Sequence, residues 1–164
     1  MKKILLVLAA MFCVATVSAQ QKFTLGGRLG SGLQADAEWF YSTDKYVEAR
    51  FGMSWMGGIS ADFTALHNWN CCNWNWTPKF ATWYLDAGVG ANLGGRPIDG
   101  VSYLYVGVAG QVKFGMQFKK VPLRLAIDYT PVFGAEMLSY KGYTEAGFFG
   151  NGLGNFGVSA VYCF

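Results

Sequence analysis

Beyond residue 21 the chain alternates apolar and polar residues over most of its length, and every charge inside an alternating stretch stands in the polar register. Successive side chains of a β-strand point to opposite faces. The pattern therefore predicts strands with one uncharged, apolar face and one face that carries all the charge. No stretch is visible that could form a second layer over the apolar face, as a soluble sheet requires.

The alternation and the turn residues between the stretches predict eight strands. They span about residues 22–30, 33–42, 47–55, 59–65, 81–92, 101–118, 123–130 and 156–164. A connection rich in Asn and Trp, ending at Pro78, joins the fourth strand to the fifth. Two longer loops are expected at 94–100 and 134–153.

A sheet without a covering layer can close on itself, with its apolar face toward lipid and its charges inside. We therefore predict an all-β fold, an eight-stranded antiparallel up-and-down transmembrane β-barrel. An even number of strands puts both chain ends on one side, which we expect to be the periplasm. The loops 94–100 and 134–153 and the turns near Ser31 and Gly57 then lie outside. The turns near Asp44, Cys71 and Lys120 lie on the periplasmic side.

The first residues predict how the chain reaches a membrane. Lys2 and Lys3 precede an apolar run from Ile4 to Val17, and small residues follow as far as Ala19. This arrangement is typical of a secretory signal peptide cleaved after Ala19, because the run is shorter than the ~20 residues that a spanning helix needs. The expected division is a signal peptide at 1–19 and an outer-membrane barrel at 20–164.

Composition supports an exported membrane protein and excludes other classes. Only 14% of the residues are charged and 17% are aromatic, which is unusual for a surface that faces water. Without Lys2 and Lys3 the chain carries eleven basic and ten acidic side chains. This balance offers no basic stripe for nucleic acid.

Ten charged side chains fall in the register expected to face the barrel interior. They are Arg28, Asp36, Glu38, Glu48, Arg50, Asp62, Asp86, Lys113, Arg124 and Asp128. Buried unpaired charge is costly, so we expect pairing across strands and hydrogen bonds to inward tyrosines and Gln111. The interior of an eight-stranded barrel is just wide enough for side chains to fill, which favours a plug. A narrow ion path lined by Asp36, Glu38 and Asp86 is the alternative.

Other motifs give little support for catalysis or cofactor binding. Gly88, Gly90 and Gly94 imitate a dinucleotide-binding turn, but no helix follows, and small inward residues that make room for bulky neighbours explain them better. The chain has one histidine, His67, which is expected at a strand end in the apolar register. We predict no enzyme activity, no cofactor and no metal site.

Six tryptophans suit a membrane-interface belt, since an indole ring has an apolar body and a polar edge; a carbohydrate-binding platform is the alternative. Three cysteines, Cys71, Cys72 and Cys163, follow the signal peptide. Their odd number leaves at least one thiol unpaired or paired between molecules. A bond from Cys163 to the turn around Cys71 is a hypothesis that the sequence leaves open.

Four segments, in this order along the chain, carry a likeness to a known family: FTLGGRLGSGL, WYLDAGVGANLGG, PLRLAIDYTPVF and GNFGVSAVYCF. From Leu25 to Phe164 the chain resembles the small outer-membrane β-barrel domain family of Bacteroidota, distantly like the eight-stranded OmpA and OmpX barrels. Tyr162 and Phe164 resemble the C-terminal signal read by the barrel-assembly machinery, although Cys163 replaces the usual basic residue. The resemblance implies a fold and an outer-membrane location in a Gram-negative envelope, within a broadly porin-like superfamily, and no defined activity.

The predicted function is a structural or surface-interacting one, with outer-membrane lipid and the assembly machinery as partners and no nucleic acid. Loops on a rigid scaffold are where such functions usually lie. The expected contact residues are Arg96, Asp99, Glu136, Tyr140, Lys141 and Tyr143. A small ion-conducting pore and a soluble lipocalin-like carrier remain as alternatives, the latter with the opposite register of charge.

Overall fold

The computed structural model describes residues 22–55, 59–98, 101–140 and 143–164. The expected signal peptide, residues 1–19, lies outside the described residues. In the described part no helix is long and apolar enough to cross a membrane.

The described residues form ten antiparallel strands and one short 3-10 helix. The strands are β1 (Phe23–Gly30), β2 (Gly32–Phe40), β3 (Lys45–Ser54), β4 (Ser60–Thr77), β5 (Ala81–Ile98), β6 (Val101–Phe118), β7 (Leu123–Tyr129), β8 (Val132–Tyr140), β9 (Tyr143–Phe149) and β10 (Phe156–Cys163), and the helix is η1 (Asn151–Gly154). Eight strands close into a ring in the order β1-β2-β3-β4-β5-β6-β7-β10, with β10 paired to β1. The prediction of an eight-stranded antiparallel up-and-down barrel is therefore confirmed.

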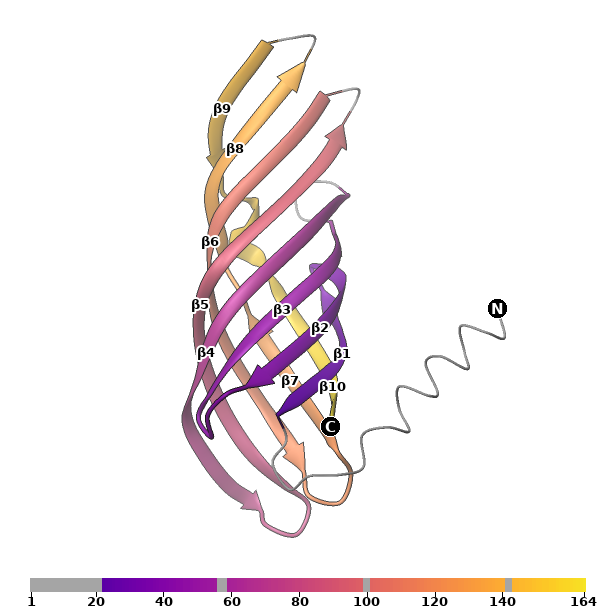
Figure 1. The fold of residues 1–164 in the computed structure, drawn as a ribbon, viewed down its shortest axis with the longest axis vertical. Helices are drawn as coiled ribbons and strands as arrows, with labels where there is room; N and C mark the ends of the chain where they lie inside the picture. Colours follow the sequence, from indigo (N-terminus) through magenta and orange to yellow (C-terminus); the bar gives the residue numbers. More distant parts are fainter. Residues whose placement is uncertain (1–21, 56–58, 99–100, 141–142) are drawn as a thin grey trace, which may run out of the picture.

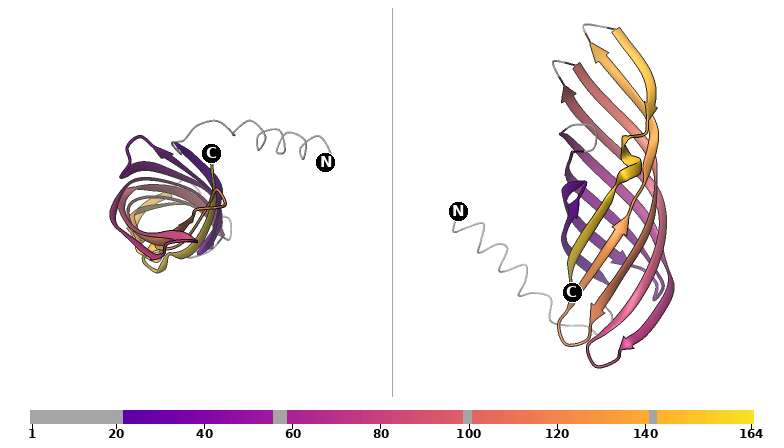
Figure 2. Two further views of the ribbon diagram at one scale, coloured as in Figure 1. Left: turned by 90° about the horizontal axis from the view of Figure 1, so that it is seen from below. Right: turned by 180° about the vertical axis from the view of Figure 1, so that it is seen from behind.

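The barrel has two unlike ends. We call the end where β1 begins and β10 ends the terminal end; it also contains the turns 41–44, 78–80 and 119–122. At the far end, β8 and β9 extend the wall well beyond β1, β2 and β3 (Figures 1 and 2). There β8 takes over from β7 as the partner of β6, after a break at Thr130 and Pro131.

The predicted connection between the fourth and fifth strands is wrong, because β4 continues to Thr77. A bulge interrupts its pairing with β5: Asn70 lies opposite Asp86 and Cys72 opposite Leu85, so Cys71 has no partner there. An extra residue shifts the alternation by one position, which explains why the pattern ended early in the sequence. The turn expected near Cys71 lies instead at 78–80.

The two predicted long loops are also mostly strand. Residues 94–98 belong to β5, and residues 101–105 of β6 pair with them; 99–100 lie outside the described residues. The stretch 134–153 contains most of β8, all of β9 and the start of η1. Both regions extend strands past the rim of the barrel. Apolar and polar residues no longer alternate clearly there, because the strands no longer have one apolar face.

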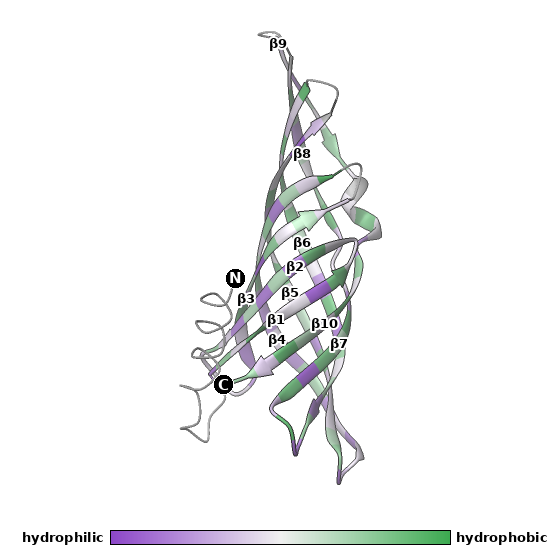
Figure 3. Cartoon of the chain, turned by 90° about the vertical axis from the view of Figure 1, so that its right-hand side faces the viewer, coloured by the Kyte–Doolittle hydropathy of each residue, from purple (hydrophilic) through white to green (hydrophobic). Residues whose placement is uncertain are grey.

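The outer wall of the ring is apolar and its interior is polar. Large apolar side chains that point outward are exposed on every strand of the ring, including Leu25, Leu33, Phe51, Phe63, Val89, Val106, Ile127 and Val158. Figure 3 shows hydrophobic and hydrophilic residues alternating along the strands. Between these apolar positions most of the inward side chains are polar or charged and almost wholly buried.

Candidate functional site

All ten charged side chains expected inside the barrel are buried, none more than 5% exposed. Their strands bring them there because each stands in the inward register, on β1 to β7. Six are acidic and four are basic, so the described interior carries two more carboxylates than cations. How these charges pair decides whether the interior is a packed plug of side chains or an open ion path.

Arg28 and Asp128 anchor the half of the network nearer the far end. The Nε and Nη2 atoms of Arg28 donate to Asp128 Oδ1 at 3.0 and 2.8 Å. Nη2 also donates to Asn155 Oδ1 at 3.0 Å, and Nη1 to Gln34 Oε1 at 3.2 Å. Four of the five guanidinium donors are engaged by these contacts, which fixes the side chain across the lumen.

Lys113 lies at the centre of the network. Its Nζ donates to Glu38 Oε1 and to Glu48 Oε2, both at 2.8 Å. Glu48 is also bound by Arg50 and by Asn68, whose amide donates at 2.8 Å. One ammonium thus joins carboxylates from β2 and β3 to β6, across the width of the barrel.

Asp36, Glu38 and Glu48 could offer oxygens for a metal ion, because one carboxylate oxygen from each lies within 4.8 Å of the others. Lys113 already supplies a positive charge to Glu38 and Glu48. Neither Asp36 oxygen accepts a hydrogen bond within the described residues, and the nearest cationic atom is Arg50 Nε at 4.0 Å. Asp36 is therefore the least compensated carboxylate of this group.

Asp62 is held by amides instead of cations. Gln34 Nε2 donates to its two oxygens at 3.0 and 2.9 Å, and Asn92 Nδ2 donates to Oδ2 at 3.3 Å. Hydrogen bonds to the charged form stabilise a buried carboxylate, as a counter-ion does. These neutral partners therefore stabilise one of the two carboxylates that are in excess over the cations.

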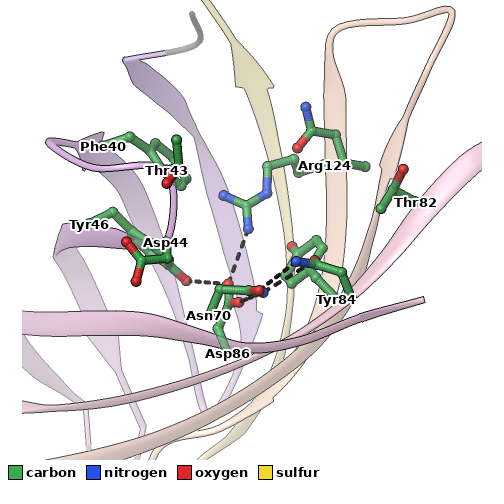
Figure 4. A pocket seen from close by; sticks show the side chains of 11 residues that line it. Phe40, Thr43, Asp44, Tyr46, Asn70, Thr82, Tyr84, Asp86 and Arg124 are labelled. Atoms are coloured by element: carbon green, nitrogen blue, oxygen red, sulfur yellow. Dashed lines mark hydrogen bonds and ion pairs between the residues drawn. The ribbon is translucent and has the colours of Figure 1, made fainter. Parts of the chain in front are cut away.

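At the terminal end the lumen opens into a pocket of about 100 Å³. Its lining comprises Phe40, Thr43, Asp44, Tyr46, Asn70, Asn73, Thr82, Tyr84, Asp86, Gln117 and Arg124. Figure 4 shows Arg124 reaching toward Asp86, which also accepts from Tyr46 at 2.9 Å and from Asn70 at 2.7 Å. Arg124 donates to Glu38 at 2.7 Å as well, so the pocket floor belongs to the ion network.

Three aromatic rings surround the Arg124 guanidinium at this mouth. Its Cζ lies 4.3 Å from the Tyr84 ring centre, 5.0 Å from that of Phe40 and 5.5 Å from that of Tyr46. The cation is therefore held by ring faces as well as by carboxylates. A pocket this small has room for water or a small polar molecule.

A buried apolar cluster includes residues of β8 and β9, the strands that extend the far end. It contains the buried residues Leu66, Tyr105, Ala109, Val132 and Phe149. The rings of Tyr105 and Phe149 stack with centres 4.3 Å apart and planes within 6°. Phe149 ends β9, so the last residue of this strand is buried in the cluster while the strand before it is exposed.

The expected surface-contact residues do not lie together on loops. Arg96 on β5 is buried and binds Glu136 of β8 at 2.7 Å, and it also faces the ring of Tyr103 at 5.0 Å. Tyr140 and Tyr143 are paired at the tip of the β8 and β9 hairpin, and Tyr143 is 78% exposed. Asp99 and Lys141 lie outside the described residues.

The outer wall carries few groups capable of chemistry. His67 is exposed there, and its Nε2 is hydrogen-bonded to the Tyr41 hydroxyl, while Ser60 and Asp62 face the lumen. Cys71 and Cys72 are exposed and Cys163 is buried, all three as free thiols. The expected assembly residues Tyr162 and Phe164 stack edge to face at 4.9 Å.

Seven neutral side chains that no sequence motif marks complete the network. They are Thr24, Gln34, Asn68, Asn70, Asn92, Thr130 and Asn155. Most of them stand in the inward register, which was the available signal. Their partners lie on distant strands, so no local pattern could identify them.

Comparison with known proteins identifies no relative. No family model, no curated protein and no solved structure matches this chain. The likeness to the small outer-membrane barrels of Bacteroidota therefore stays a prediction.

Proposed function

We propose that this protein is an integral outer-membrane β-barrel with a side-chain-filled lumen and a structural or surface-interacting role. The observation that carries the proposal is the division of the wall, apolar outside and charged inside. A closed ring satisfies its own backbone groups, which is what a strand-built protein needs in lipid. In water, the same outer face would expose an apolar band around the whole ring.

The far end supports an interaction role. β9 pairs with β8 on one side, and within the described residues no strand pairs with its other edge. Its side chains from Tyr143 to Phe148 are exposed, with Phe148 at 73%. An unpaired edge with exposed aromatics can add a strand or side chains from a partner. We propose this hairpin as the contact region, in place of separate loops.

The filled interior supports a plug over a pore. Glu38 and Asp86, two of the three residues of the alternative ion path, are engaged by Arg124 at 2.7 and 3.2 Å. The cluster around Tyr105 and Phe149 is buried and apolar, which does not suit an ion path. A carrier of the lipocalin type would need an apolar interior, which the buried charges argue against.

Fractionation and bilayer recordings test the proposal together. We expect the protein to stay in outer-membrane fractions until detergent is added, to migrate faster on a gel before heating than after, and to give flat current traces in planar bilayers. Release without detergent would refute membrane insertion. Stable unitary currents would refute the filled lumen and favour the pore.

Removal of the far-end hairpin tests the interaction role. A variant in which a short turn replaces residues 136–147 should keep the ring and its heat-modifiable migration, since β8 pairs with β6 outside the ring. We expect this variant to lose binding to envelope or host-surface extracts that the full chain binds. Equal binding by both proteins would place the contact region elsewhere.

A further inference from the structure

Five exposed lysines surround the terminal end of the barrel. They are Lys22, Lys45, Lys79, Lys119 and Lys120, which we call the lysine rim. Lys22 precedes β1, Lys45 begins β3, and the other three lie in the turns 78–80 and 119–122. These turns lie side by side, because the backbone N–H of Lys119 donates to the carbonyl of Phe80 at 3.0 Å.

The rim carries a large excess of positive charge. Among the described residues, no lysine of the rim forms an ion pair, and the one exposed acidic side chain at this end is Asp44. The Nζ of Lys119 donates to two neutral oxygens, Asn75 Oδ1 at 3.2 Å and the Pro78 carbonyl at 2.9 Å. The far end lacks such an excess in its described part: its cationic side chain there is Arg96, which is paired with Glu136.

An aromatic cluster lies next to the rim on the outer wall. It consists of Trp74, Trp76, Trp83 and Phe114, with ring centres 5.4 Å apart for Trp74 and Trp76 and 5.5 Å apart for Trp83 and Phe114. Lys45 pairs with Trp69, on the same outward face. Tryptophan favours the boundary between acyl chains and headgroups, and lysine extends from that boundary into water.

We propose that the lysine rim binds the phosphate groups of anionic phospholipids in the leaflet at the terminal end. The inference rests on the proposed function, because it requires an inserted barrel. On β3 the outward apolar positions end at Val47, and the next outward position toward the terminal end is Lys45, so this cation stands where headgroups begin. The excess of positive charge, next to indole rings, matches an anionic headgroup better than a zwitterionic one.

An acidic cell-wall polysaccharide is the competing occupant of a basic rim on the periplasmic side. It would use the charge but not the aromatic cluster, which faces outward along the wall and not away from the membrane. The position of the indoles beside the lysines therefore favours the lipid, and the experiment separates the two.

The tryptophans provide a native reporter for the test. The full chain is inserted into nanodiscs of phosphatidylcholine in which brominated phosphatidylglycerol or brominated phosphatidylcholine replaces part of the lipid, and quenching of tryptophan fluorescence gives the relative association constant of the two lipids. We expect a preference for phosphatidylglycerol that weakens with added salt, because salt screens exposed charge. Each lysine near an anionic surface contributes about a fivefold effect at most.

A triple variant identifies the lysines as the cause. Lys45→Gln, Lys79→Gln and Lys120→Gln together remove three charges whose side chains make no hydrogen bond within the described residues, and should abolish most of the preference. The same three positions changed to Arg form the matched control, which should keep it. Lys119 is left unchanged because it joins two turns.

Each outcome decides the inference. Equal association of both lipids with an inserted, heat-modifiable barrel, or an unchanged preference in the Gln variant, would overturn the inference and leave the proposed function standing. Failure of the barrel to insert into either nanodisc would overturn both. No lipid preference, together with lysine-dependent cosedimentation with isolated cell-wall polysaccharide, would overturn the lipid in favour of the polysaccharide.

Discussion

Arg28 on β1 and Asp128 on β7 form a 2.8 Å ion pair across the strand between them, β10. The guanidinium crosses β10 at Gly157, where a Cβ atom would lie 2.5 Å from Cζ of Arg28. The absence of a side chain at one position of the middle strand therefore allows two strands that are not neighbours to be joined through the lumen.

Gly157→Ala should destabilise the barrel by about 3 kcal/mol, since the added methyl group must displace Arg28 and weaken its bonds to Asp128. Equilibrium unfolding in urea, followed by tryptophan fluorescence of the protein in vesicles, measures the change. Gly147→Ala on β9 is the control, because a Cβ atom there meets nothing within 4 Å. Equal stability of the two variants would contradict the proposed role of Gly157.

Lys113→Met should lower the free energy of unfolding by roughly 3–5 kcal/mol, because Glu38 and Glu48 would share one buried cation fewer. The methionine keeps most of the volume of the lysine side chain, so the loss reports charge and not a cavity. The same urea titration measures it. A variant as stable as the parent would show that the two carboxylates do not depend on this ammonium.

Asp36→Asn should change the free energy of unfolding in the opposite direction to Lys113→Met and raise the urea midpoint. Asp36 accepts no hydrogen bond in the described part of the chain, and the surrounding lumen already has more acidic than basic groups. Removing the least compensated of the buried charges stabilises the folded state. The double variant with Lys113→Met should therefore recover part of the stability that the single change loses. Destabilisation by Asp36→Asn alone would imply that this carboxylate has a partner.

Arginine on the outer wall should report the membrane directly. Val89→Arg places a charge at a position of β5 that is 54% exposed and lies within the apolar band, which costs about 2–4 kcal/mol at the centre of a bilayer. Thr144→Arg on the exposed hairpin strand β9 is the control and should change stability little. If both variants fold into vesicles with equal stability, the apolar wall does not face acyl chains.

The alternation was sufficient to predict which face each side chain takes on most strands. A strand has a period of two, and a buried face fixes its register, so a charge such as Lys113 among apolar neighbours indicates the lumen side. The same reasoning predicted the closed ring, because no other layer was available to cover the apolar face.

Two kinds of feature could not be predicted from the sequence. On β4 the bulge at Cys71 moves the outward register from odd residues such as Trp69 to even ones such as Trp74, so the strand pattern is interrupted. At the far end, β9 is exposed on both faces and has no alternation to read. The partners within the lumen, such as Glu38 and Arg124, are 86 residues apart and meet only after the ring closes.

The three thiols should react unequally in the folded protein. Cys71 and Cys72 are exposed on β4, whereas Cys163 is buried on β10 opposite Thr24. Without any reductant, a polar maleimide should label two thiols of the folded barrel and the third only after heating in detergent. Cys163→Ser should leave the labelling of the folded form unchanged, and Cys71→Ser should halve it. Labelling of fewer than two thiols before reduction, with recovery afterwards, would instead indicate a disulfide that involves the bulge of β4.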